Sequence, residues 1–196
     1  MQQLKADLAF RAREEGFDDL RGLFALQRGK LSIAAMPSFA SNCLPRTLVA
    51  LVQRFPNINI NVQDIVMEEV ISAVQSGRVE LGITFEPDSM DGLDFQPLFN
   101  DRFIAIMPPN HELAANSEVP FADLLSYTLV SLNRGSSTRR WTDNAIDEAG
   151  RKPPHIFEAF QLTTVGAMVA AGAGVAAVPA LCQQQMEALG AICVPI

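Results

Sequence analysis

Apolar and polar residues alternate along the chain with two different periods. Short apolar runs at 31–35, 79–85 and 129–132 are typical of parallel strands that are covered on both faces. At 44–55 and 68–76, apolar residues recur at helical spacing, and a proline or glycine follows directly. Strands that alternate with helices in this way predict an α/β fold with a parallel sheet and right-handed crossovers.

The strand–helix alternation occurs twice, which predicts two Rossmann-like lobes of similar order. The first series comprises strand 31–35, helix 44–55, a strand with Ile58, Ile60 and Val62, helix 68–76 and strand 79–85. The second series comprises strand 129–132, helix 139–149, strand 156–160, helix 162–171 and strand 175–178. Extended segments at 93–98 and 102–107 join the two series, so we expect crossover strands and a hinged cleft.

The predicted boundaries follow from this order. We place lobe one at about 29–98 and lobe two at about 99–190, with 191–196 returning toward lobe one. Residues 1–28 have helical periodicity, interrupted near Gly16, but they are highly charged. An ordinary packing helix and a dimerising linker both fit that pattern.

The charge distribution argues against nucleic acid as a direct partner. The net charge is −7, and residues 31–196 carry nine basic and seventeen acidic side chains. An acidic body repels a phosphate backbone. We therefore expect this region to be a poor nucleic-acid binder by itself.

The distribution of apolar residues favours a cytoplasmic location without membrane contact. No apolar run reaches the roughly 18–20 residues that span a bilayer. The first 17 residues are charged throughout and lack the apolar centre of a secretory signal peptide.

The motif content predicts no catalytic, metal or cofactor chemistry. The three cysteines, Cys43, Cys182 and Cys193, form no CxxC and have no paired histidine, so neither a disulfide framework nor a zinc site is indicated. Cys43 lies near a predicted helix N-terminus, where a thiolate is stabilised, and a redox role there is a minor alternative. Because no nucleophile elbow, phosphate loop or HExxH occurs, we predict that the protein is not an enzyme.

Two strand-to-helix junctions carry the main candidate binding residues. They are Ser38 and Phe39 in lobe one, and Arg134, Gly135, Ser136 and Ser137 in lobe two. Free backbone N–H groups and the helix dipole favour an anion at such junctions, and hydroxyl groups add further donors. We therefore predict a small carboxylate as the ligand. The alternative is that these hydroxyl groups only cap their helices.

Further candidates lie where other strands end or helices begin. They are Met67, Thr84, Phe85, Phe160, Thr163 and Pro179. Because ligands collect outside the carboxyl ends of parallel strands, we expect Thr84, Phe85 and Pro179 to face the ligand. Met67 is polarisable and apolar, which indicates a partly apolar ligand, with simple packing as the alternative.

Several segments, in the same order along the chain, resemble the effector-binding domain of LysR-type transcriptional regulators. They are GKLSI at 29–33, Leu44–Pro45 with Phe55–Pro56, GRVELGI at 77–83, PLF at 97–99, PPNHELA at 108–114 and VAAGAGVAAVP at 169–179. The resemblance covers about residues 18–196 and implies a two-lobed fold like that of type 2 periplasmic binding proteins. It implies that a small molecule between the lobes changes how a dimer or tetramer holds DNA, and that 18–27 ends the linker helix.

Departures from the family pattern shape this expectation. Nothing in residues 1–17 resembles the winged helix-turn-helix that precedes the family's linker, and the family usually continues past Ile196. Glu112 and Met67 stand where proline and a small hydroxyl residue are common. We therefore expect a fragment, with DNA binding only through a helix-turn-helix of the full-length regulator. The alternatives are a solute-binding protein of a transport system, which predicts a secretory signal, and a stand-alone ligand-binding domain.

Overall fold

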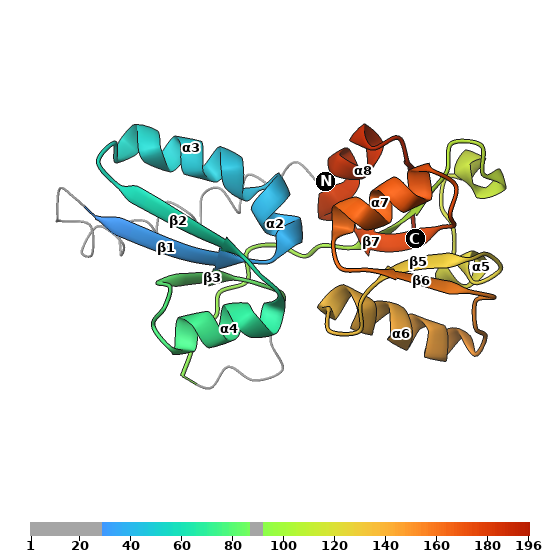
Figure 1. Ribbon diagram of the computed structural model, residues 1–196, viewed down its shortest axis with the longest axis horizontal. Coiled ribbons are helices and arrows are strands. Elements are labelled where there is room, and N and C mark those ends of the chain that lie inside the picture. The colour runs from blue at the N-terminus through green and yellow to red at the C-terminus, as the bar shows by residue number, and fades with distance from the viewer. Residues whose placement is uncertain (1–28, 87–91) are drawn as a thin grey trace. The chain divides into compact units, whose positions relative to one another are not determined.

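The computed structural model describes residues 29–86 and 92–196, which form two compact units. Of the described residues, unit 1 contains those up to Met36 and Cys43–Asn100, and unit 2 contains Pro37–Asn42 and Asp101–Ile196 (Figure 1). The predicted linker at 1–28 lies outside the described residues.

Unit 1 contains a parallel sheet with the strand order β2-β1-β3 and a helix on each face (Figure 1). Its elements are β1 (Lys30–Ala35), α3 (Leu44–Arg54), β2 (Asn59–Asp64), α4 (Met67–Gln75) and β3 (Leu81–Ile83). The predicted β-α-β-α-β order is confirmed. The third strand is shorter than predicted, because the N–H groups of Arg78 and Val79 bond to Ala73 O at the end of α4.

Close packing of α4 on the unit 1 sheet depends on glycine. Ala34 of β1 contacts Val70, Ala73 and Val79 in a small buried cluster. A Cβ at Gly82 of β3 would lie 2.7 Å from Val74 Cγ2 and 2.9 Å from Val70 Cγ1. The hydrogen at Gly82 therefore lets α4 approach β3.

Unit 2 contains a three-stranded sheet of order β7-β4-β8 and a two-stranded sheet β5-β6, which a parallel bridge joins in the order β6-β5-β7-β4-β8. Its elements are α2 (Pro37–Asn42), β4 (Phe103–Met107), η1 (Glu112–Ala115), α5 (Phe121–Leu124), β5 (Leu129–Leu132), α6 (Ser137–Ala149), β6 (Ile156–Ala159), α7 (Leu162–Ala170), β7 (Ala176–Pro179), η2 (Ala180–Cys182), α8 (Gln183–Ala188) and β8 (Ile192–Pro195). β5 pairs with β6 in parallel, and a parallel bridge between Leu129 and Val175 places β5 beside β7. β4 is antiparallel to both of its neighbours, β7 and β8.

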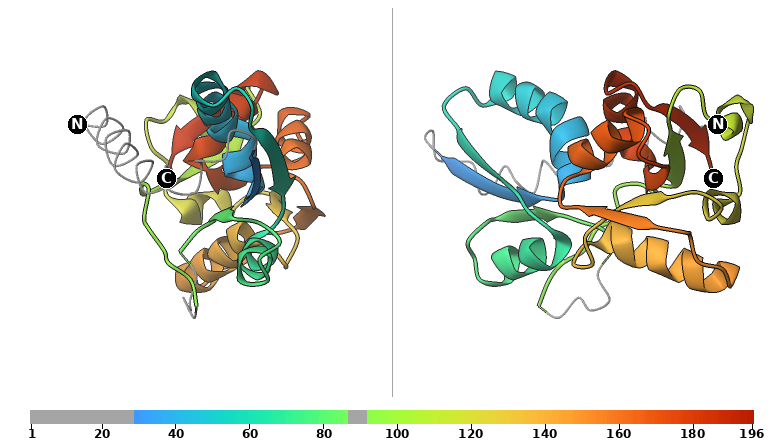
Figure 2. Two further views of the ribbon diagram at one scale, coloured as in Figure 1. Left: turned by 90° about the vertical axis from the view of Figure 1, so that its left-hand side faces the viewer. Right: turned by 45° about the vertical axis from the view of Figure 1, so that its right-hand side comes forward.

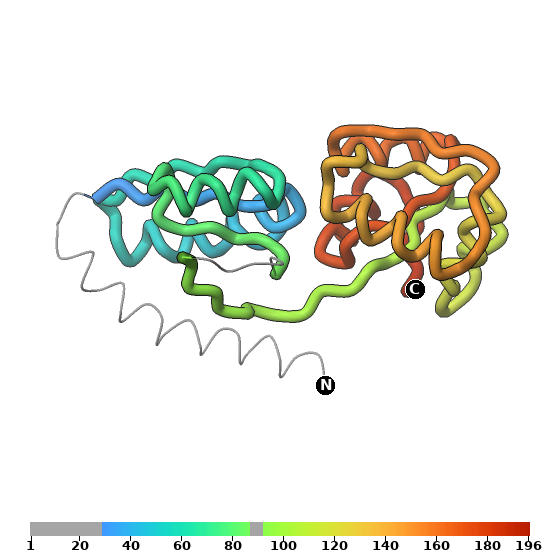
Figure 3. The backbone as a smooth tube through the Cα atoms, turned by 90° about the horizontal axis from the view of Figure 1, so that it is seen from below, coloured from blue at the N-terminus to red at the C-terminus, as the bar shows by residue number. Residues whose placement is uncertain are grey.

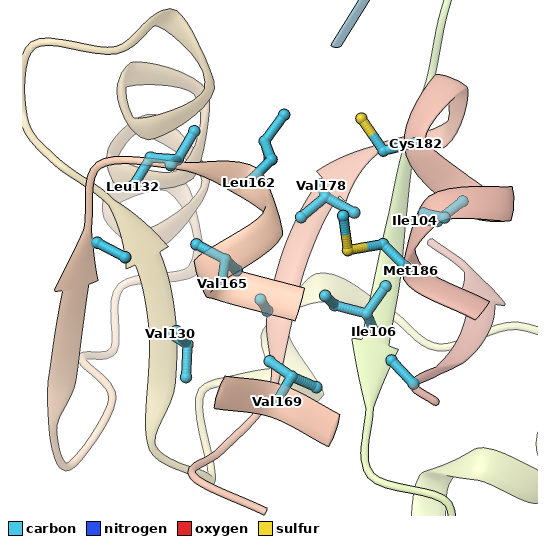
Figure 4. Close-up of a cluster of buried hydrophobic side chains, with 13 residues drawn as sticks. Ile104, Ile106, Val130, Leu132, Leu162, Val165, Val169, Val178, Cys182 and Met186 are labelled. Carbon is cyan, nitrogen blue, oxygen red and sulfur yellow. The ribbon is translucent and has the colours of Figure 1, made fainter. Parts of the chain in front are cut away.

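Alternate residues of the unit 2 strands face two separate hydrophobic cores. Ile104 and Ile106 of β4 join the core under α7 and α8, whereas Ala105 and Met107 join the core under α5 and α6. Figure 4 shows the first core, in which Val165 of α7 gathers with residues of β4 and α8. Figure 2 shows the helices on both faces of this sheet. This period of two explains why the strands read as continuous apolar runs.

Three segments differ from the prediction. Residues 38–42, which fall within the predicted lobe one, belong to α2, which packs against η2 in unit 2. The segment 93–98 contains no strand and belongs to an extended run that leads from unit 1 to unit 2 (Figure 3). Residues 192–195 form β8, which pairs with β4 inside unit 2 instead of returning to lobe one, because its N–H and C=O groups complete the ladder of β4.

Candidate functional site

In unit 2, three parallel strands end at the same edge of the sheet. β5, β6 and β7 run in one direction, so the residues after Leu132, Ala159 and Pro179 share that edge. In open α/β sheets, ligands bind outside the carboxyl ends of parallel strands. We call this edge the unit 2 edge.

The N-terminus of α6 presents hydrogen-bond donors at the unit 2 edge. Ser136 is the N-cap residue, and its Oγ accepts a hydrogen bond of 3.0 Å from the N–H of Arg139. The first-turn N–H groups of Ser137 and Thr138 have no acceptor within the helix. Ser136 therefore caps the helix, as the alternative interpretation predicts, while its hydroxyl proton and two N–H groups can donate elsewhere.

A buried arginine holds the base of this junction together. The side chain of Arg139 is only 3% exposed. Its Nη1 donates to Leu132 O at 3.1 Å and to Glu158 Oε1 at 2.8 Å, and its Nε donates to Asp143 Oδ1 at 2.7 Å. Burial lowers the pKa of Arg139, but the hydrogen bonds to Asp143 and Glu158 outweigh it, so the pKa lies above its ordinary value. Arg139 is therefore a charged structural link between the ends of β5 and β6.

Arg134 differs from Arg139 because its side chain is 83% exposed. Its Nε lies 4.0 Å from Glu158 Oε1, the oxygen that also accepts from Arg139. At that distance the pair is a loose ion pair, which contributes little to stability in water. Arg134 is thus a solvent-exposed cation close to the α6 N-terminus.

Other predicted residues lie near the same edge with different surroundings. Ser38 is buried in α2, which packs against η2 immediately after Pro179, and Asn42 Nδ2 lies 3.9 Å from Cys182 Sγ. Phe160 follows β6 and is 79% exposed. Thr163 in the first turn of α7 accepts a hydrogen bond of 3.1 Å from Gln185 of α8, so its hydroxyl oxygen already has a partner.

In unit 1, the predicted donors converge on a sulfur atom. Thr84 Oγ1 and the N–H of Phe85 donate to Met36 Sδ at 3.3 and 3.4 Å. The N–H of Met36 donates to Ile83 O at 3.0 Å, so these groups lie where β1 and β3 end. A thioether is a weak acceptor, and the two donors are only weakly satisfied. Met67 is buried at the start of α4, as its packing alternative predicts.

The structure therefore distributes the predicted residues over both units. Unit 2 contains Ser38, Phe39, Arg134, Gly135, Ser136, Ser137, Phe160, Thr163 and Pro179, and unit 1 contains Met67, Thr84 and Phe85. Sequence reasoning missed the structural role of Arg139 and the position of Glu158. The structural role of Arg139 could have been inferred from its spacing to Asp143, which lies four residues later on the same helix.

The described ranges, residues 29–86 and 92–196, contain neither a metal-ligand cluster nor a membrane-spanning helix. Within these ranges no group of three His, Cys, Asp or Glu side chains is arranged to hold a metal ion. No helix in the described part of the chain is long and apolar enough to span a membrane. Burial, and then the charge of Glu187, raises the pKa of the Cys193 thiol to about 11, which opposes thiolate chemistry there.

The sequence is similar to LysR-type proteins, both in a family profile and in individual relatives. A family profile described as the LysR substrate binding domain matches residues 25–196. The transcriptional activator protein LysR of Escherichia coli (strain K12) is 30% identical over 169 residues, which are 85% of this chain and 53% of that protein. The chain thus spans about half the length of this curated relative.

Solved structures share the fold. The effector-binding domain of QuiR in complex with shikimate has a TM-score of 0.75 at 15% identity, covering 86% of this chain and 81% of that one. The BenM effector-binding domain with its effector benzoate has a TM-score of 0.75 at 23% identity, covering 86% and 77%. This likeness confirms the predicted α/β fold of the type 2 periplasmic-binding-protein kind.

Proposed function

Because this chain belongs to the family of LysR substrate-binding domains, we propose that it is the effector-sensing part of a transcriptional regulator. We place the binding of a small carboxylate at the unit 2 edge. In the complete regulator, a dimer or tetramer holds DNA through a helix-turn-helix, and the effector changes that hold. The curated relative is named a transcriptional activator, and two solved neighbours contain the carboxylates shikimate and benzoate.

The observation that supports this proposal best is the pairing of the α6 N-terminus with Arg134. α6 has 13 residues, so its dipole is fully developed at Ser137. Arg134 adds a full positive charge with an accessible side chain. A carboxylate that accepts from the first-turn N–H groups and from Arg134 forms charge-assisted hydrogen bonds, which are stronger than neutral ones.

The test is a melting-temperature screen of the purified chain with a panel of monocarboxylates that includes benzoate and shikimate. We expect carboxylates, but not the matched neutral amides, to stabilise the protein. A ligand at 100 times its Kd stabilises by about 2.7 kcal/mol. Titration calorimetry then gives the affinity of each compound that raises the melting temperature.

A matched pair of arginine variants locates the site. Arg134→Gln should weaken carboxylate binding severalfold, whereas Arg151→Gln should leave it unchanged. Arg151 follows the other end of α6 and donates to Ser126 Oγ at 2.9 Å, so its substitution makes the same charge change away from the site. Equal affinities for the two variants, or a panel without any stabilising carboxylate, would contradict the proposal.

A further inference from the structure

Glu158 places a fixed negative charge next to the proposed carboxylate site. Its Oε1 accepts from Arg139 Nη1 at 2.8 Å, and Arg139 is itself held by Asp143 and Leu132 O. Because Arg139 is buried and bonded on three sides, the carboxylate of Glu158 has a defined position. Glu158 Oε1 also lies 4.0 Å from Nε of Arg134, the residue that we propose binds the ligand carboxylate.

The charges at this junction are therefore divided unequally. Arg139 is engaged by Asp143 and Glu158, which together supply two negative charges to one buried cation. Arg134 has only the loose contact with Glu158 among the ion pairs of the described residues. A single carboxylate at Arg134 replaces that loose contact, whereas Glu158 repels a second negative charge that the ligand carries next to Arg134.

We infer that Glu158 is a specificity-determining residue that restricts the site to monocarboxylates and disfavours dicarboxylates. This inference rests on the proposed function, because it concerns the same site. Two like charges a few ångströms apart repel by about 1 kcal/mol in water-like surroundings, which corresponds to about fivefold in affinity. Glu158 also competes for Arg134, so it lowers the affinity for a monocarboxylate to a smaller extent.

Asp143 provides a matched control for Glu158. Both carboxylates pair with Arg139, at 2.7 Å for Asp143 and 2.8 Å for Glu158, and their side chains are 45% and 44% exposed. Only Glu158 also forms an ion pair with Arg134 in the described part of the chain. Glu158→Gln and Asp143→Asn thus remove the same charge from Arg139, but only the first removes the charge beside Arg134.

The experiment compares benzoate, benzene-1,3-dicarboxylate and 3-carbamoylbenzoate by titration calorimetry on the wild type and both variants. The carbamoyl compound has the size of the dicarboxylate but a single charge, so it separates steric from electrostatic exclusion. We expect Glu158→Gln to raise the affinity for the dicarboxylate relative to the carbamoyl compound by about threefold or more. Asp143→Asn should leave that ratio unchanged.

The possible results separate the two proposals. An equal ratio in Glu158→Gln and Asp143→Asn, or no binding of the dicarboxylate by Glu158→Gln, overturns the inference about Glu158. A wild type that binds no carboxylate of the wider panel overturns the proposed function as well. If Glu158→Gln unfolds, the double variant Arg139→Met/Glu158→Gln replaces it, because it leaves no unpaired buried cation. The double variant Arg139→Met/Asp143→Asn is then the matched control.

Discussion

Both units collect hydrogen-bond donors at the carboxyl ends of parallel strands, but the donors meet different partners. In unit 1, Thr84 and Phe85 donate to the neutral sulfur of Met36. In unit 2, the α6 N-terminus lies beside Arg134, and Arg139 binds two carboxylates. The same strand–helix order therefore produces one junction whose donors meet a neutral sulfur and one junction whose donors lie among charged side chains. Thus the order of strands and helices sets where donors gather, while individual side chains decide which ligand chemistry they favour.

Adding a methyl group at Gly174, where a Cβ would lie against a backbone oxygen, should give the largest loss of stability. A Cβ at Gly174 in unit 2 would lie 2.2 Å from Thr128 O, a backbone atom, whereas at Gly82 in unit 1 it would meet valine methyl groups. Overpacking in a core costs about 1–3 kcal/mol. We expect Gly174→Ala to exceed that range, because the ladder between β5 and β7 must shift, and Gly82→Ala to fall within it. Denaturant unfolding monitored by circular dichroism measures both. Equal costs would show that the two sheets tolerate crowding alike.

The two arginines of unit 2 should differ clearly in their effect on stability. Arg139→Met removes hydrogen bonds to two carboxylates and to Leu132 O, and we expect a loss of about 2–3 kcal/mol. Arg134→Met breaks only an exposed pair and should change the free energy of unfolding by less than about 0.5 kcal/mol. Urea titrations of the two variants provide the comparison. A large loss in Arg134→Met would mean that the exposed arginine also has a structural role.

Removal of a hydroxyl group at either junction should give the smallest losses of stability, and the loss in unit 2 should exceed that in unit 1. Ser136→Ala removes the N-cap of α6 and should cost about 1 kcal/mol. Thr84→Val removes a donor to a weak sulfur acceptor, so we expect a loss below about 0.5 kcal/mol. Thermal unfolding of both variants, with Ser137→Ala as the control for α6, tests this order. A greater loss in Thr84→Val would show that the sulfur contact stabilises unit 1 more than the cap stabilises α6.

The sequence predicts those elements whose signals are local. The strand at 129–132 is predicted with its observed bounds, because an apolar run is followed directly by polar turn residues. The helix ending at Ala149 is also predicted, and Gly150 has a φ of 64°, the left-handed conformation expected at its C-terminus.

Features that depend on distant partners are not predicted. The apolar pattern of 103–107 indicates a buried strand, but it does not indicate that β4 is antiparallel to β7 and β8. Likewise, α2 is a short polar segment whose grouping with unit 2 depends on contact with η2. At the candidate site, Ser136 and Arg134 follow from their position after a strand. The positions of Arg139 and Glu158 follow only once β5 and β6 are paired, because that pairing brings their side chains together.

The central position of β4 has a consequence for synthesis of the chain on the ribosome. The described strands of unit 1 lie within Lys30–Ile83, so they can pair soon after this segment emerges. β4 must wait for both neighbours, because β7 begins at Ala176 and β8 at Ile192. Until then the apolar strand Phe103–Met107 has two open edges, which are attractive to other nascent chains and to chaperones. The ladder of β4 can therefore be completed only after the strands of unit 1 have been synthesised.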